Sequence, residues 1–91
     1  MDLHDLIAAE LTEAKSLGAL IYLIRAGREL EFSVEGKMYF LSRDRSAQYA
    51  SLWDGDSEQS FNSVEELLSR AAVNGRPFLE QWKKARIEAL F

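Results

Sequence analysis

Apolar residues in the first third of the chain recur at every third or fourth position, the spacing that places them on one face of a helix. The first series follows Asp2, whose side chain can cap a helix: Leu3, Leu6, Ile7, Leu11 and Ala14. We predict a first helix that ends near Gly18. Residues 19–27 keep the helical spacing up to Gly27, where a left-handed cap belongs. We predict a second short helix there, although this apolar run also suits a buried strand.

From residue 28 to residue 44 the apolar positions alternate with polar ones, as in strands that bury one face. The Glu35-Gly36 step lies between two such runs and predicts a two-residue turn. That turn pairs the strands in one register: Val34 with Lys37, Phe32 with Tyr39 and Leu30 with Leu41. We expect one face of this hairpin to form a wall of the core, while Met38 and Phe40 point to the other face.

A third strand is predicted after the hairpin. Residues 43–47 are typical of a turn, and residues 48–56 contain the strand. Tyr49 and Trp53 share one face of that strand, and Leu52 lies on the other, because successive side chains alternate. Consecutive strands joined by short turns favour an antiparallel meander.

The last third of the chain favours short helices and one more strand. Residues 58–61 can add a strand, and Ser63 with Glu66 has the spacing of a capping box at the start of a helix. Pro77 suits the first position of another short helix. Residues 85–91 fit either a continuation of that helix or a strand at the sheet edge, and we favour the strand. These elements predict an α+β fold: N-terminal helices, an antiparallel three- to four-stranded sheet and two short C-terminal helices.

Length and composition indicate the number of domains and the cellular compartment. The 91 residues suffice for a single compact domain over residues 1–91, and 47% of them are hydrophobic, as in ordinary globular proteins. No cysteine occurs, which excludes disulfides and thiolate metal sites and fits a reducing cytoplasm. The sequence shows neither a secretion signal nor an apolar run long enough for a membrane span. We therefore expect a cytoplasmic protein.

The charge pattern makes nucleic acid an unfavourable partner. The formal net charge is -4, which argues against the phosphate backbone of nucleic acid as the main ligand. Local groups of basic side chains exist at two places: Arg43 with Arg45, and Lys83, Lys84 and Arg86. Such scattered cations usually belong to a solvated surface. Binding of nucleic acid is not expected.

Two stretches carry candidate chemistry. Residues 54–65 place oxygen-bearing side chains at the offsets of a calcium loop, but Gln59 stands where that loop requires glycine. A polar turn at Asp54-Gly55 explains the same residues, and we expect no metal and no cofactor. His4 is the single histidine, and the sequence provides no oriented nucleophile beside it. We expect no enzyme activity.

The aromatic residues predict a partner site. They exceed what one small sheet under a few helices must bury, so some of them reach the surface. Alternation places Met38, Phe40 and Leu52 opposite the main apolar face of the hairpin. An exposed apolar patch of this kind marks a contact with a partner protein or with a second copy, unless another element covers it. We predict a small non-catalytic protein–protein interaction module, a regulator or inhibitor of a larger partner. The alternatives are a small-ligand-binding protein and a self-assembling structural domain.

Two strings in the chain resemble a loose group of small uncharacterised bacterial proteins. They are "GRELEFSVEGKMYFLSR" and "SFNSVEELLSRAAVNGRPFLEQW", and together they extend over residues 27–82. The shared positions are turns, helix caps and core residues, so the resemblance implies an architecture. No activity is known for the group, and the resemblance implies none for this chain.

Overall fold

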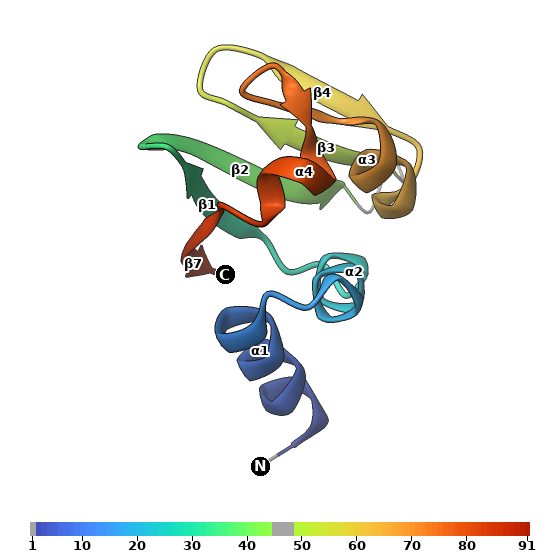
Figure 1. Ribbon diagram of the computed structural model, residues 1–91. Helices are drawn as coiled ribbons and strands as arrows, with labels where there is room; N and C mark the ends of the chain where they lie inside the picture. The colour runs from blue at the N-terminus through green and yellow to red at the C-terminus, as the bar shows by residue number, and fades with distance from the viewer. Residues whose placement is uncertain (1, 45–48) are drawn as a thin grey trace.

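The computed structural model describes residues 2–44 and 49–91 of the chain (Figure 1). The helices of the described part are α1 (Leu3–Ala14), α2 (Leu17–Arg25), α3 (Val64–Arg70) and α4 (Phe78–Trp82). The strands are β1 (Leu30–Val34), β2 (Lys37–Asp44), β3 (Tyr49–Trp53), β4 (Glu58–Phe61), β5 (Ala72–Val73), β6 (Arg76–Pro77) and β7 (Arg86–Leu90). The turn predicted at residues 43–47 falls mostly on residues 45–47, which lie outside the described residues.

An antiparallel sheet with the strand order β4-β3-β2-β1-β7 is the centre of the fold. The predicted α+β class, with N-terminal helices and two short C-terminal helices, is confirmed. The sheet has five strands, because the strands predicted at residues 58–61 and 85–91 both join it. A separate two-stranded hairpin, β5-β6, turns at Asn74 and Gly75, which both have positive φ.

The N-terminal helices form as predicted, but the boundary between them differs. Asp2 caps α1, its Oδ1 accepting from the amide of Asp5 at 2.9 Å. The helix ends at Lys15, which adopts the left-handed conformation with φ 52°. The hydroxyl of Ser16 then caps α2 by accepting from the amide of Ala19 at 3.2 Å. Gly18 therefore lies in the first turn of α2 and does not end α1, because a serine cap begins a new helix before the glycine.

The hairpin has the predicted register. β1 and β2 pair Val34 with Lys37, Phe32 with Tyr39 and Leu30 with Leu41. At the turn Glu35 has φ 52° and Gly36 has φ 82°. Positive φ at both central residues is the turn type whose twist matches that of the flanking strands. Sequence pattern and turn chemistry thus fix this register together.

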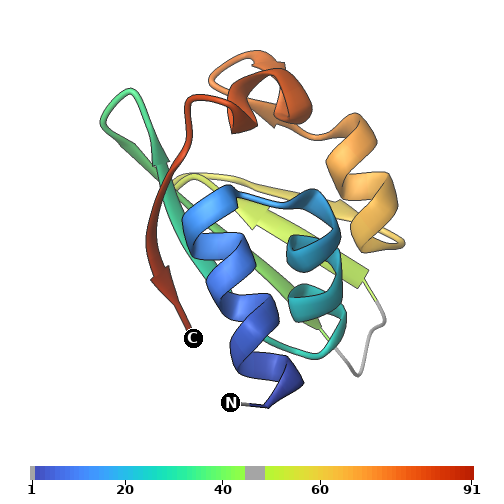
Figure 2. The ribbon, with the colours of Figure 1, turned by 60° about the horizontal axis from the view of Figure 1, so that its bottom comes forward.

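The hydrophobic core lies between the helices and one face of the sheet (Figure 2). Figure 2 shows α1 and α2 lying in front of the strands. Each of the helices α1 to α4 adds buried side chains to the cluster that covers this face, among them Leu11, Leu23, Leu67 and Trp82. The ring of Phe32 lies at the centre of this cluster. Its centroid is 5.4 Å from that of Tyr39, 5.9 Å from Phe78 and 5.7 Å from Trp82.

The opposite face of the sheet, called the open face below, corrects one sequence prediction. Leu52 was expected beside Met38 and Phe40, but it is only 1% exposed and pairs with Leu41 on the core face. Trp53 lies on the open face, where Leu52 was expected, and pairs with Phe40. Alternation within one strand shows which residues share a face. Which of the two faces meets the core depends on the register with the neighbouring strand. The sequence alone did not fix the register between β2 and β3.

Candidate functional site

The strand register places one row of side chains across the open face. Trp53 on β3 lies beside Phe40 on β2, and Phe40 lies beside Glu31 on β1. On the other side of Trp53 the register continues to Glu58 on β4. Directly opposite residues in such a row have Cβ atoms about 5 Å apart, so they are neighbours on the face. The row therefore holds two adjacent aromatic residues with a glutamate on either side of them.

The aromatic part of this row belongs to a wider apolar surface. Met38 is 43% exposed and Trp53 is 42% exposed. Phe40 is half-buried, and its ring centroid lies 6.2 Å from that of the exposed Phe91. We call these side chains the apolar patch: Met38, Phe40, Trp53 and Phe91. Of the predicted partner-binding residues, Met38 and Phe40 lie together in this patch, whereas Leu52 lies in the core.

A shallow hollow of about 350 Å³ opens within the apolar patch. Met38, Phe40 and Trp53 line it together with Glu31 and Asp54. An apolar floor with a few charged groups at the margin is typical of a binding hollow on a protein surface. The thioether of Met38 adds a flexible side chain that can adapt its shape to a ligand.

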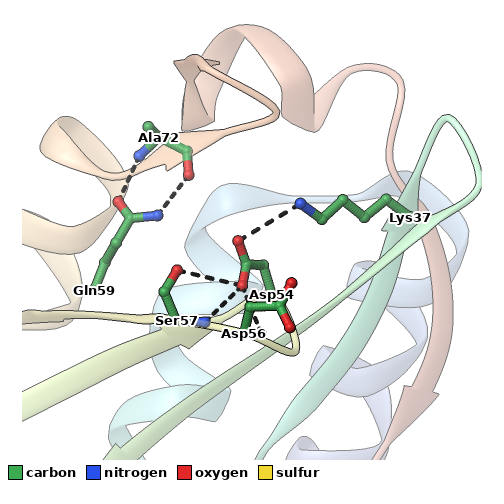
Figure 3. A network of polar contacts seen from close by, with 6 residues as sticks. All are labelled: Lys37, Asp54, Asp56, Ser57, Gln59 and Ala72. Carbon is green, nitrogen blue, oxygen red and sulfur yellow. Dashed lines mark hydrogen bonds and ion pairs between the residues drawn. The ribbon is translucent and has the colours of Figure 1, made fainter.

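Asp54 organises the turn at one end of the hollow (Figure 3). Its Oδ1 accepts from the Ser57 amide at 2.9 Å and from the Asp56 amide at 3.0 Å, and Lys37 Nζ lies 3.6 Å from Oδ2. The two amides and then the Lys37 ammonium lower the pKa of Asp54 from 3.8 to about 2. The carboxylate is thus ionised at neutral pH and fixed within its own turn.

The polar turn predicted at Asp54-Gly55 is confirmed, with Gly55 at φ 101°. Across residues 2–44 and 49–91, no group of three or more histidine, aspartate or glutamate side chains is arranged to hold a metal ion. Glu58 and Ser60 of the calcium-loop spacing lie on the extended strand β4, opposite Trp53 and Ser51 on the open face. The oxygen at Asp54 instead caps the amides of the turn.

Other polar side chains near this turn hold the strands together. Gln59 lies on the core face of β4, where its amide donates to the carbonyl of Ala72 at 2.7 Å and accepts from the Ala72 amide at 2.8 Å (Figure 3). This pair of hydrogen bonds joins β4 to β5. Ser51 Oγ lies 3.5 Å from Ser60 Oγ on the open face. These residues have structural partners.

His4 lies in the first turn of α1, as expected. Its Nε2 is 2.5 Å from the Nη1 of Arg28, and its ring centroid is 6.2 Å from that of Tyr22. Since a guanidinium can only donate, this imidazole nitrogen accepts. The geometry links α1 to the segment before β1.

A second hollow, of about 270 Å³, lies between α2, β3 and the start of α3. Arg25 and Arg43 line it, but both already have partners in the structure. Arg25 forms an ion pair with Glu65, and Arg43 donates to the carbonyl of Arg25 at 2.9 Å. Cations bound in this way offer little to a ligand, so the hollow of the apolar patch is the stronger candidate site.

Several residues of the site were not assigned from sequence: Trp53, Phe91, Glu31 and Glu58. Each belongs to a separate strand or to the chain after β7, and only the pairing of strands brings them together. The alternation that placed Met38 and Phe40 on one face also gives Glu31 that face. Alternation already placed Trp53 and Leu52 on opposite faces of β3. Only the register between β2 and β3 shows that Trp53 is the one on the open face.

Comparisons of the chain with family models, with curated proteins and with solved structures return no match. Within the part of the chain that the structure describes, no helix has the length and apolar character needed to cross a bilayer.

Proposed function

We propose that this protein is a small non-catalytic protein–protein interaction module of the cytoplasm that regulates or inhibits a larger partner. The single observation that carries this proposal is the apolar patch on the open face. Met38 and Trp53 leave about two-fifths of their surface in water on a sheet face that supplies little to the core. Clustered apolar side chains of this kind favour a docking surface.

The composition of the patch supports a contact with protein. Tryptophan, methionine and phenylalanine are enriched in interface cores, and tryptophan often supplies a large share of the binding free energy. The strands below the patch are held by backbone pairing on both sides, so the surface is rigid. A preformed rigid surface loses little conformational freedom on binding.

The test is an affinity capture from the native lysate, with tagged wild-type protein beside two variants of one chemistry. Met38→Asp adds a charge at a side chain that is 43% exposed in the patch. Leu79→Asp adds the same charge at a side chain that is 44% exposed on α4, away from the open face. We expect a stoichiometric partner that wild type and Leu79→Asp retain and that Met38→Asp loses.

Two outcomes contradict the proposal. Equal retention by both variants moves the contact away from the apolar patch. Capture of no other protein, together with a dimer or larger species in sedimentation equilibrium, indicates a self-assembling domain. A thermal unfolding curve of each variant shows whether a lost interaction merely reflects a lost fold.

A further inference from the structure

We propose that the occupant of the apolar patch is a basic amphipathic segment of the partner, with arginine or lysine side chains on both sides of a large apolar one. This inference rests on the proposed function and adds the chemistry of the partner. It follows from the charges that surround the patch, which the aromatic residues alone do not specify.

The first argument is the position of two carboxylates. Glu31 and Glu58 flank Phe40 and Trp53 on either side in the row. Three strand spacings separate them, which amounts to about 14 Å. A helix with its side chains is about 10 Å wide, so one that lies over the two rings brings its flanking cations within reach of both carboxylates.

The second argument is that these carboxylates have no cation of their own. Within the described residues, no lysine, arginine or histidine nitrogen lies within ion-pair distance of Glu31 or Glu58. Lys37, at the hairpin end of β2, and Arg86, opposite Ser33 on the open face, are already engaged. Lys37 pairs with Asp54 at 3.6 Å, and Arg86 pairs with Glu88 at 3.5 Å. The open face therefore presents unpaired negative charge around an apolar centre.

The third argument is the aromatic surface between the carboxylates. A guanidinium or ammonium group over the face of an exposed indole is attracted by the negative charge of the ring face. Both Trp53 and Glu31 line the hollow of the apolar patch. Arginine side chains stack on aromatic rings while they donate to carboxylates, so one arginine can use both features.

The same charges disfavour the other occupants. A second copy placed on this face about a two-fold axis over the row brings the glutamates of one copy near those of the other, and like charges in an interface oppose association. Phosphate groups of nucleic acid or of anionic lipids meet the same repulsion. A basic protein segment is the occupant that the charge pattern favours.

The test is a peptide titration followed by NMR of the tryptophan indoles. The probe is an acetylated and amidated helical peptide of leucine, alanine and arginine, and its counterpart has glutamate in place of each arginine. Trp53 reports on the patch. Trp82 serves as an internal reference, because it is buried in the core and its indole nitrogen donates to the Lys15 carbonyl at 3.0 Å. We expect the arginine peptide to shift the Trp53 indole signal saturably and the glutamate peptide to leave it unchanged.

Charge-neutral variants locate the effect. In the double variant Glu31→Gln with Glu58→Gln, we expect the arginine peptide to bind about three- to tenfold more weakly, as for two partly solvated ion pairs. The matched control Glu13→Gln removes one exposed carboxylate from α1 and leaves the affinity unchanged. Added salt weakens wild-type binding more than binding of the double variant.

The outcomes separate this inference from the proposed function. If both peptides shift Trp53 equally, or if the double variant binds as wild type does, the charge preference is wrong. The loss of a lysate partner in Met38→Asp then still supports the patch as a protein contact. Absence of any Trp53 shift, or a shift that appears with protein concentration in the absence of peptide, overturns the basic segment; the latter identifies a second copy as the occupant.

Discussion

At the scale of single residues, Asp54 fixes the turn between β3 and β4. Its pKa of about 2 reflects amide donors from Ser57 and Asp56 and, to a smaller extent, the ammonium of Lys37. A carboxyl group with a lowered pKa in the folded state stabilises the fold above its ordinary pKa of 3.8. It loses that contribution as the pH falls through about 2.

The variant Asp54→Asn tests this assignment. An asparagine keeps an oxygen acceptor for the two amides but has no charge to titrate. We expect the melting temperature of the variant to depend less on pH between about 4 and about 2 than that of wild type. Thermal unfolding in steps of pH measures this difference. The control is Asp56→Asn in the same turn, which should keep the wild-type slope; an unchanged slope in Asp54→Asn would contradict the assignment.

Substitution by alanine should have opposite effects on stability at two glycines. Gly36 has φ 82° in the hairpin turn, with no heavy atom within 4 Å of the position of an added Cβ. Gly36→Ala should therefore destabilise the fold by about 1 to 2 kcal/mol through backbone strain alone. Gly18 lies in α2, where an added Cβ meets only Ser16 Oγ at the ordinary contact distance of 3.7 Å. Gly18→Ala should stabilise the fold by about 0.5 to 1 kcal/mol.

Urea unfolding of both glycine variants gives the two free energies. A loss of stability at both positions, or at neither, would contradict the conformations assigned to Gly36 and Gly18.

At the scale of elements, Lys15 joins the end of α1 to the end of α4. Its ammonium donates to the carbonyls of Trp82, Lys83 and Ala85 at 3.0, 2.8 and 3.0 Å. In return its own carbonyl accepts from the indole of Trp82 at 3.0 Å. The last carbonyls of a helix have no partner within it, so a cation there satisfies them. This contact links residues far apart in the sequence, and no local sequence pattern predicted it.

The variant Lys15→Met keeps the apolar stem of the side chain and removes the ammonium. We expect a loss of about 1.5 to 3 kcal/mol in the free energy of unfolding, the range for hydrogen bonds to a charged group. Lys84→Met is the matched control. Its ammonium lies 3.6 Å from an exposed carboxylate of Glu35, a pair that contributes about 0 to 1 kcal/mol. Chemical denaturation compares the two, and equal losses would mean that the Lys15 contacts add nothing beyond a surface ion pair.

At the scale of the whole molecule, the described residues form a sheet whose helices pack on one face and leave the open face uncovered. The two faces predict different costs for removing an aromatic ring. Phe32 is buried among the rings of Tyr39, Phe78 and Trp82, so Phe32→Ala should destabilise the fold by about 3 to 5 kcal/mol. Trp53 remains 42% exposed, and Trp53→Ala should cost about 1 kcal/mol, a part of what full burial contributes.

Calorimetry of the two variants at one pH tests this difference between the faces. A similar fall in melting temperature for Phe32→Ala and Trp53→Ala would show that the open face is packed like the core. That result would also contradict the apolar patch as a surface for partners.

Much of the fold was accessible from local sequence features. The Glu35-Gly36 turn and the alternation around it gave the hairpin register, and Asp2 and Ser63 marked two helix starts that the structure confirms. Each of these features depends on residues close together in the chain. Alternation favoured a strand at the sheet edge over residues 85–91, but its place beside β1 depends on contacts between residues more than fifty positions apart.

The candidate site was only partly predictable. Met38 and Phe40 followed from the hairpin, because turn and register fix their face. Leu52 was placed wrongly and Trp53 was not assigned, because the pairing of β3 with β2 determines which side of β3 faces the helices.

The sequence by itself determined most of the helices and strands, the first hairpin and the acidic, cysteine-free character of the chain. These are properties of local backbone preference, of short-range hydrophobic spacing and of composition. Only the tertiary structure decided which face of the sheet the helices cover, and that Glu58, Trp53, Phe40 and Glu31 form one row. The physical reason is that a shift of one residue in strand pairing exchanges the two faces, and burial of the larger apolar set against the helices selects between them.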